Sequence, residues 1–320
     1  MRRLVARAPT RIDFAGGWTD VPPYPAEHEG FVCNVAITRY ATVTVGPGAD
    51  HHEVPLVTAA LHRALLGNVR VELRSDYPVG AGLGGSSAAG VTLAGALAAW
   101  RGEPLSRIEL AERSCTTERS DLGVAGGSQD HYAAAFGGVL ALRFRRFAID
   151  VDSIALDAAT RAELARRCLL FFTGESRISA RQIQVVIDAL GRGDARVLGL
   201  LAGMKQHALD AADALRRGSI DDLGRIVGAH WALQRELHPS ISTDTIDAIC
   251  LRSYAAGAIG CKALGASGGG CVIVITGEDN DADVRQAIGD LATPLDYAVD
   301  TDGFTVVSDA VVSEAELADA

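Results

Sequence analysis

A glycine-rich segment that runs directly into a stretch of small residues is the feature that most constrains the fold of this chain. Residues 78–89 read Pro-Val-Gly-Ala-Gly-Leu-Gly-Gly-Ser-Ser-Ala-Ala, with four glycines in six positions. Glycine permits positive φ angles and lets a ligand come close to the backbone. The small residues from 86 to 100 predict a helix, and a helix N-terminus offers unpaired N–H groups and the positive end of a dipole. The segment therefore predicts a phosphate-binding loop at a helix N-terminus.

Two other interpretations of this segment remain open on the residues alone. It could be a simple glycine turn in which Ser86 or Ser87 caps the helix. It could also be a dinucleotide-binding fingerprint, but that motif follows a first strand and needs an acidic residue about 20 positions later at a strand end. The acids in that region, Glu103 and Glu109, fall in helix or turn context. The density of glycine before two serines favours phosphate binding.

A second glycine cluster, residues 265–271, comes directly before an apolar run at 272–275. Two such loops can close on one nucleotide or sugar, so the pair of loops strengthens the prediction of a ligand site. The chain has only two lysines, Lys205 and Lys262, and neither follows a glycine. The GxxxxGK[ST] phosphate loop is therefore excluded.

Several acids outside these loops are candidates for chemistry. Phosphoryl transfer needs a carboxylate that holds magnesium and often another that receives the proton of the acceptor. Glu118 and Asp130 flank a glycine-broken loop that could aim both at one cleft, although each acid taken alone fits a surface position better. Near the N-terminus Arg11, Asp13 and Asp20 interrupt an apolar strand. A buried arginine needs a carboxylate partner, and a short acid there could bind sugar hydroxyls.

The order of the expected elements predicts two α+β lobes. Strands and a glycine-rich crossover come first, and helices with a small sheet follow. The break is expected near residues 145–165, where polar and charged residues concentrate, which gives domains of residues 1–155 and 156–320. The expected strands include 4–8, 11–15, 31–37, 41–45, 69–73, 138–144, 168–173, 271–276, 295–299 and 303–307.

Charge and cysteine usage exclude several classes of protein. A net charge of −10 argues against binding to nucleic acid or to an anionic membrane. No apolar stretch approaches 18 residues, and residues 1–7 lack the apolar core of a signal peptide. Six cysteines lie far apart without a CxxC pair, so we expect reduced core thiols and a cytoplasmic protein, either monomer or homodimer. The histidines show no HxxxH or HExxH spacing of a metal site.

Three spaced motifs are similar to those of a known family. They are residues 8–20 (Ala-Pro-Thr-Arg-Ile-Asp-Phe-Ala-Gly-Gly-Trp-Thr-Asp), 78–89 and 262–271. Together they resemble the superfamily of galactokinase, homoserine kinase, mevalonate kinase and phosphomevalonate kinase (GHMP kinases). The Ala-Gly-Gly-x-Thr-Asp sequence with a following Pro-Pro resembles the branch of heptose 7-phosphate kinases and fucokinases.

The resemblance implies a fold and a nucleotide site. The fold would be α+β and two-lobed, with an N-terminal lobe like ribosomal protein S5 domain 2, a C-terminal ferredoxin-like lobe and the site between them. The cofactors would be ATP and Mg²⁺, with Ser86 and Glu118 as the metal ligands. The residues expected at the nucleotide are Gly80, Gly82, Leu83, Gly84, Gly85, Ser86 and Ser87.

The resemblance also implies catalytic and substrate-binding residues. Asp130 matches the catalytic aspartate that takes the proton of the sugar hydroxyl, and Arg11 matches an arginine beside it. Asp20 matches an aspartate that binds sugar hydroxyls. The other residues expected at the substrate are Gly17, Thr19, Gly268 and Gly269. If the substrate already carries a phosphate, Arg177 and Arg181 are candidates to bind it, with a solvated helix face as the alternative.

Departures from the family pattern limit the substrate. Gly17 and Trp18 stand where galactokinases carry a Glu-His pair, which argues against galactose. Gly85 stands where many members have another serine, and Ser267 interrupts the usual all-glycine third motif. Residues 17–20 and Asn34 favour a fucokinase, whereas residues 127–130 and 133–138 favour a heptose 7-phosphate kinase.

The expected function is therefore that of an ATP-dependent sugar kinase. It would phosphorylate the anomeric hydroxyl, most simply of D-glycero-D-manno-heptose 7-phosphate. The alternatives are a fucokinase-like kinase of a free sugar and a non-catalytic sensor of sugar and ATP on the same fold.

Overall fold

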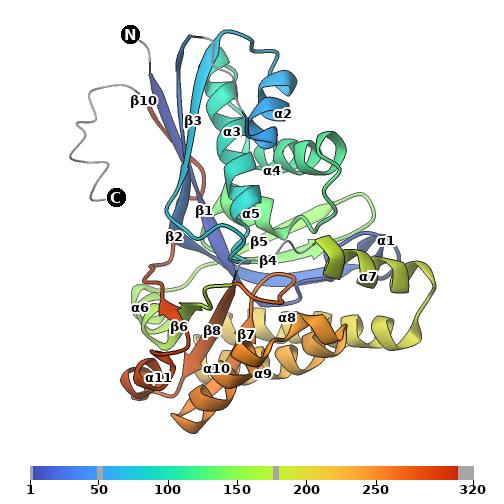
Figure 1. Cartoon of the computed structure of the whole chain (residues 1–320), viewed down its shortest axis with the longest axis vertical. Coiled ribbons are helices and arrows are strands. Elements are labelled where there is room, and N and C mark those ends of the chain that lie inside the picture. Colours follow the sequence, from blue (N-terminus) through green and yellow to red (C-terminus); the bar gives the residue numbers. More distant parts are fainter. Residues whose placement is uncertain (1–2, 49–52, 176–179, 309–320) are drawn as a thin grey trace.

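Two antiparallel sheets, each with its own helices, build the molecule. The computed structural model describes residues 3–48, 53–175 and 180–308 (Figure 1). One sheet and helices α2 to α5 form the upper lobe of Figure 1, and the second sheet with α6, α10 and α11 forms the lower lobe. The two-lobed α+β architecture expected from the sequence is confirmed.

The first sheet has six strands in the order β10-β1-β2-β4-β5, with β3 also paired to β2. The long strand β2 accommodates two neighbours along one edge, because β4 pairs with residues 30–35 and β3 with residues 41–47. The strands are β1 (Leu4–Ala15), β2 (Gly30–Pro47), β3 (Val69–Ser75), β4 (Val139–Phe144), β5 (Ile149–Ile154) and β10 (Thr305–Ser308).

The number and length of the strands predicted near the N-terminus were wrong. Four short strands were expected, but the structure has two long ones, β1 and β2. Pro9 does not end β1, because the register of the β1–β2 pair shifts between Pro9 and Thr10 and so accommodates the missing N–H donor. Strand β5 was not expected, since its polar residues alternate on a half-exposed edge. Residues 295–299 do not form the expected strand and make one isolated bridge, Ile37 to Val299.

Helix α3 (Gly85–Arg101) packs along the first sheet and is buried on nearly every side. Its alanines and glycines allow this close packing: a Cβ at Gly90 would meet the Ser114 hydroxyl oxygen at 2.3 Å, and one at Gly95 would meet the Phe304 ring at 2.1 Å. The small-residue run that follows the glycine loop is therefore a packing requirement of a central helix. The other helices of this lobe are α1 (Tyr24–His28), α2 (Pro55–Arg63), α4 (Arg107–Thr116) and α5 (Gln129–Phe136).

The second sheet has the strand order β7-β8-β6-β9. With its connecting helices this is the β-α-β-β-α-β order of a ferredoxin-like lobe. The strands are β6 (Cys168–Phe172), β7 (Ala258–Ala263), β8 (Cys271–Thr276) and β9 (Thr293–Pro294). The helices are α6 (Ala158–Arg167), α7 (Ala180–Gly191), α8 (Ala195–Arg216), α9 (Ile220–Glu236), the 3₁₀ turn η2 (Pro239–Ile241), α10 (Asp244–Ala255) and α11 (Asp281–Ile288).

One hydrophobic cluster spans the two lobes. Helix α8 contacts β1 and β2 of the first sheet and also packs against α9, which covers β7 of the second. One buried cluster accordingly contains Phe14 of β1, Ala208 of α8 and Ile273 of β8. The chain also returns to the first sheet at its end, where β10 pairs with β1. The expected division at residue 155 stays a prediction, and β10 belongs to the first sheet although it lies in the second half of the sequence.

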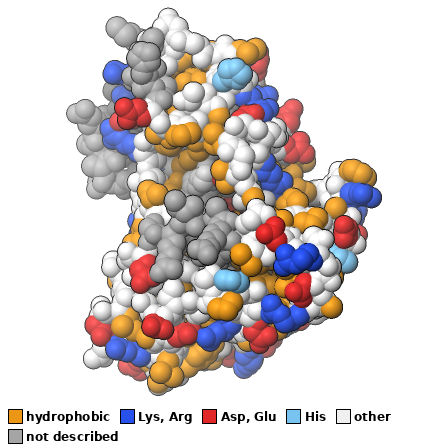
Figure 2. Space-filling model, turned by 45° about the vertical axis from the view of Figure 1, so that its right-hand side comes forward, with side chains coloured by type: hydrophobic (Ala, Val, Ile, Leu, Met, Phe, Trp, Pro, Cys, Tyr) orange, Lys and Arg blue, Asp and Glu red, His pale blue; other side chains and the backbone are white. Residues whose placement is uncertain are grey.

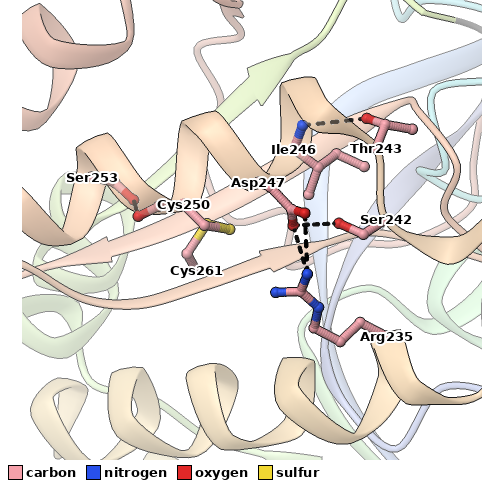
Figure 3. Close-up of a disulfide and its surroundings, with 8 residues drawn as sticks. All are labelled: Arg235, Ser242, Thr243, Ile246, Asp247, Cys250, Ser253 and Cys261. Carbon is pink, nitrogen blue, oxygen red and sulfur yellow. Dashed lines mark hydrogen bonds and ion pairs between the residues drawn. A yellow bond between two sulfur atoms is a disulfide. The ribbon is translucent and has the colours of Figure 1, made fainter. Parts of the chain in front are cut away.

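Two cysteines are paired, contrary to the expectation of reduced thiols. Cys250 on α10 and Cys261 on β7 form a disulfide, with 5.6 Å between their Cα atoms (Figure 3). Helix α10 packs on β7 and brings the two residues together, which no CxxC spacing could reveal. Nearby, Asp247 of α10 binds Arg235 and the Ser242 hydroxyl and so fixes the start of this helix (Figure 3). Disulfides are uncommon in the cytosol, and the cytoplasmic location stays a prediction.

No described helix is suited to span a membrane. None of them combines the length and the apolar character that a bilayer crossing requires. On the face drawn in Figure 2, acidic and basic side chains intermingle over the lower lobe.

Candidate active site

The glycine-rich loop ends at the N-terminus of α3, as the sequence predicts. Gly84 is the N-cap residue, with a φ of 73° that favours glycine, and no side chain caps the helix. The first N–H groups of α3 are therefore left without a capping partner, which is the arrangement that binds anions. The Ser86 side chain is exposed at this helix end, whereas the Leu83 side chain is buried in the core and can meet a ligand only through its backbone.

Arg11 joins the predicted base to this loop. Its Nε donates to Oδ1 of Asp130 at 2.7 Å, and its Nη1 donates to the carbonyl oxygen of Gly82 at 2.5 Å. The Arg11 side chain is 4% exposed and that of Asp130 is 24% exposed, so the carboxylate remains open to a substrate while its partner is buried. A Cβ at Gly84 would lie 2.9 Å from Cγ of Asp130, so the loop packs directly on the carboxylate.

Glu118 lies opposite the start of α3. It belongs to a π-helical turn, η1 (Thr117–Asp121), that follows α4, and such turns are frequent at functional sites. Ser86 donates to Oε1 of Glu118 at 2.9 Å, and Ser87 donates to Oε2 at 3.2 Å. The two residues predicted to hold a metal, Ser86 and Glu118, are therefore in contact.

His131 completes a hydrogen-bond network behind Glu118. Its Nε2 lies 3.0 Å from Oε2 of Glu118 and its Nδ1 lies 2.9 Å from the Ser114 hydroxyl. Burial tends to raise the pKa of Glu118, but hydrogen bonds from His131, Ser86 and Ser87 outweigh it, and the net pKa is lowered. Glu118 is thus fixed as a carboxylate, the form that binds a cation.

Asp20 is buried against a loop of the first lobe. It is 3% exposed, and its Oδ2 accepts the backbone N–H of Gln129 at 3.0 Å. Burial raises the pKa of Asp20 to about 6, although the Gln129 N–H opposes this shift. A Cβ at Gly127 would meet Oδ2 of Asp20 at 1.9 Å, so only glycine fits beside it. Asp20 thus contacts Gln129, the residue that directly precedes the predicted base Asp130.

Thr19 and Gly17 lie in the segment that leads to Asp20. The Thr19 hydroxyl donates to the carbonyl oxygens of Gly16 and Phe31 and accepts the N–H of Phe31. It is fully buried, and these bonds fix the shape of the segment. At Gly17 a Cβ would lie 2.3 Å from Oδ2 of Asp13, so a glycine is required there by packing.

The second glycine cluster packs against the first. The N–H of Cys271 donates to the carbonyl oxygen of Ala81 at 2.8 Å, and a Cβ at Gly82 would meet the carbonyl oxygen of Leu264 at 2.7 Å. The structure therefore brings the two loops together. Gly268 donates its N–H to Ile241, and Gly269 faces Glu175, where a Cβ would meet the carbonyl oxygen at 3.1 Å.

Packing explains the glycine at position 85, where the sequence resemblance would place a serine. A Cβ at Gly85 would lie 2.3 Å from the ring of Tyr77, and the Tyr77 hydroxyl donates to the Gly85 carbonyl at 2.8 Å. Tyr77 therefore occupies the space that a serine side chain would need.

The sequence alone did not indicate some contacts at the candidate site. Two of the residues that it led us to expect at the substrate cannot be placed. His131 directly follows the predicted base, but this position alone gave no sign that its ring faces Glu118. Gly127 and Gln129 belong to the motif at residues 127–130, but no local pattern indicates their contact with Asp20. Arg177 lies outside the described residues, and the Arg181 side chain is likewise not described.

The comparisons with known proteins agree with this geometry. The pattern of the GHMP kinases N terminal domain matches residues 54–138, and that of the GHMP kinases C terminal domain matches residues 211–292, together more than half of the chain. The chain therefore belongs to the GHMP kinases, which use ATP as the phosphoryl donor.

Relatives within the family share most of the chain. The D-glycero-alpha-D-manno-heptose 7-phosphate kinase of Campylobacter jejuni is 28% identical over 302 residues, which cover 84% of this chain and 88% of that protein. The L-fucokinase/L-fucose-1-P guanylyltransferase of Bacteroides fragilis is 29% identical over 336 residues, which cover 87% of this chain but only 35% of that protein. The predicted resemblance to these two kinds of kinase is confirmed.

A solved structure supports the fold. The D-glycero-D-manno-heptose 1-phosphate kinase from Bacteroides thetaiotaomicron superposes with a TM-score of 0.79 at 23% identity, covering 96% of this chain and all of that one. At this identity the likeness shows the fold alone.

Proposed function

We propose that this protein is an ATP- and Mg²⁺-dependent sugar kinase that phosphorylates the anomeric hydroxyl of D-glycero-D-manno-heptose 7-phosphate. The observation that carries the proposal is the Arg11 bridge between Asp130 and the carbonyl of Gly82. This bridge fixes a partly exposed carboxylate next to a phosphate-binding helix end. A kinase needs both groups in one place, because phosphoryl transfer depends chiefly on positioning and on charge stabilisation.

The mechanism assigns one task to each group. Asp130 accepts the proton of the sugar hydroxyl as that oxygen bonds to the terminal phosphorus of ATP, and ADP leaves with the electron pair of the broken bond. Arg11 orients the carboxylate through its Nε–H. Backbone N–H groups of residues 84–87 bind the phosphate oxygens and stabilise their charge. Asp20 accepts hydrogen bonds from hydroxyls of the sugar.

The residues at Glu118 fit a magnesium ion. Mg²⁺ prefers oxygen ligands and is usually bound by one or two carboxylates together with substrate phosphates and water. The Glu118 carboxylate and the Ser86 hydroxyl, 2.9 Å apart, are such oxygens. Among the described residues no group of three acids, histidines or cysteines could hold a metal alone, which suits an ion that arrives with ATP. When bound, the ion neutralises charge on the phosphates.

The choice of substrate rests on the relatives and on the differences between this chain and the galactokinase motif at Gly17 and Trp18. The heptose 7-phosphate kinase matches over 88% of its own length, whereas the fucokinase relative contains a long additional part that this chain does not match. A free-sugar kinase of the fucokinase kind is the second candidate, favoured by its 29% identity to this chain. Arg177 and Arg181 are proposed to bind the 7-phosphate in the first case. The presence of Asp130, Glu118 and Ser86 together disfavours a sensor without activity.

A coupled assay of ADP release over a panel of sugars tests the proposal. The panel contains heptose 7-phosphate, fucose, galactose, mannose and cyclitol phosphates. We expect the highest kcat/KM with heptose 7-phosphate and a product phosphorylated at C1, which ³¹P NMR identifies. A preference for fucose would favour the second candidate, and no turnover with any sugar would contradict the proposal.

The variant Asp130→Asn tests the proposed base in the same assay. It keeps the size of the side chain and removes the base, so we expect kcat to fall by about 10²–10⁴. ATP binding, measured by calorimetry, should persist, because Asp130 does not form the phosphate loop. Near-full turnover in this variant would contradict the role of Asp130.

A further inference from the structure

A buried ion pair joins the two lobes beside the candidate sugar site. Nζ of Lys262, on β7, donates to Oδ2 of Asp13, on β1, at 2.9 Å and to the Asp13 carbonyl oxygen at 2.8 Å. Lys262 is fully buried and Asp13 is 2% exposed. Because β1 belongs to the first sheet and β7 to the second, the pair crosses the interface between the lobes.

The Asp13 carboxylate lies against the segment of residues 16–20, which we call the sugar-binding segment. A Cβ at Gly17 would stand 2.3 Å from Oδ2 of Asp13, so the carboxylate fills the space beside the Gly17 backbone. Any movement of the carboxylate therefore changes the support of the segment that leads to Asp20.

A second contact from the other lobe fixes the same segment. The N–H of Gly16 donates to Nε2 of His230, on α9, at 2.8 Å. Burial lowers the pKa of His230 well below its usual value, and the nearby Lys262 lowers it further. The ring is therefore neutral, and Nε2 can accept this hydrogen bond. The second lobe thus reaches the segment twice, directly through His230 and indirectly through Lys262, which fixes Asp13.

Stability alone gives no reason to keep a charged pair at this position. Moving two charges out of water is costly, and neutral residues of similar size are often tolerated equally well. Oδ1 of Asp13 also finds no hydrogen-bond partner among the described residues, so the pair is not fully compensated. Burial lowers the pKa of Lys262, and the Asp13 charge opposes this shift.

We propose that Asp13 and Lys262 are positioning residues that fix the sugar-binding segment against the second lobe and so present Asp20 to the substrate. Asp13 follows Arg11 by two residues on β1, so both side chains leave the strand on the same face. The proposal rests on the proposed function for the nature of the ligand at Asp20. It concerns the geometry of residues 16–20, which can be measured without any substrate.

The test compares single and double neutral variants. Lys262→Met alone leaves an unpaired buried carboxylate, and we expect Tm to fall by roughly 10 °C. Asp13→Asn combined with Lys262→Met removes both charges, and Tm should return to within about 3 °C of the wild type. In this double variant we expect the amides of Gly16 and Thr19 to exchange hydrogen at least about tenfold faster. The sugar KM should rise about tenfold and the ATP KM should change less than about twofold.

A control removes another ion pair, outside the site, whose cation is buried and whose carboxylate is exposed. Arg167, on α6, is 3% exposed and pairs with Asp221 of α9. The double variant Arg167→Met with Asp221→Asn should leave exchange at residues 16–20 and the sugar KM unchanged.

The outcomes separate this proposal from the proposed function. Restoration of amide protection and sugar KM together with Tm would overturn the positioning role, and so would failure of the neutral double variant to fold. If the wild type turns over no sugar, the proposed function fails, while hydrogen exchange of residues 16–20 still decides whether the pair positions the segment.

Discussion

Nε2 of His131 lies 3.0 Å from Oε2 of Glu118, and His131 is the residue that directly follows Asp130. Helix α5 thus presents the proposed base on one side and supports the proposed metal ligand on the other. The Ser114 hydroxyl contacts the second ring nitrogen at 2.9 Å and so orients the ring. One turn of helix therefore couples the two carboxylates that phosphoryl transfer requires.

Replacement of His131 by Ala should weaken the metal site. Glu118 would lose the partner that orients its carboxylate, and we expect the Mg²⁺ concentration for half-maximal activity to rise about 10- to 100-fold. Calorimetry of Mg²⁺·ADP binding and of metal-free ADP binding provides a readout that does not depend on turnover. Only the metal-dependent part of ADP affinity should fall, and an equal loss of both would assign His131 to the general stability of the loop.

The raised pKa of Asp20 predicts a pH dependence of sugar binding. A buried carboxyl with a pKa of about 6 is protonated at pH 5 and ionised at pH 7. The ionised form accepts more hydrogen bonds from hydroxyls, so the sugar KM should fall as the pH rises through about 6. The KM of Asp20→Asn should be high and independent of pH over this range. An unchanged slope in that variant would attribute the titration to another group.

The same shift predicts how stability depends on pH. The folded pKa of Asp20 lies above the unfolded value of 3.8, so the unfolded state releases its proton first as the pH rises. The free energy of unfolding should therefore fall between pH 4 and pH 6, by about 3 kcal/mol for this group. The difference between wild type and Asp20→Asn in urea titrations isolates this contribution, and a difference that does not vary with pH would argue against the raised pKa.

Gly127→Ala should impair sugar binding selectively. The new Cβ would lie 1.9 Å from Oδ2 of Asp20, so the carboxylate would have to move away from the Gln129 N–H. Loss of a hydrogen bond to a charged group corresponds to about a 10- to 100-fold rise in sugar KM. Gly126→Ala is the matched control, because nothing lies within 4 Å of a Cβ there. Equal effects of both substitutions would contradict the contact.

Arg177→Ala tests the binding of a substrate phosphate. If the arginine binds the 7-phosphate, the KM for the phosphorylated sugar should rise about 10-fold or more, and that for the unphosphorylated sugar should not change. Arg192→Ala, an exposed arginine just after α7, serves as the control. Equal losses with both sugars would remove the phosphate-binding role.

Local patterns in the sequence predicted the elements of the site that depend on neighbouring residues. The glycine run before Ser86 predicted a phosphate loop at a helix start, because φ preference and helix-end chemistry act within a few residues. The motif at residues 8–20 likewise made Arg11 and Asp20 candidates for the site. It did not indicate the length of β1, since the register shift at Pro9 depends on the partner strand.

The tertiary structure alone decided which groups meet. Arg11 and Asp130 are 119 residues apart, and Asp13 and Lys262 are 249 apart. No local preference determines such contacts, because they arise only when β1 packs against α5 and when Lys262 reaches it from the second lobe. The same holds for the contact of His131 with Glu118 and for the disulfide of Cys250 with Cys261. The sequence by itself determined the chemistry available to this protein, and packing of distant elements around β1 decided how that chemistry is arranged.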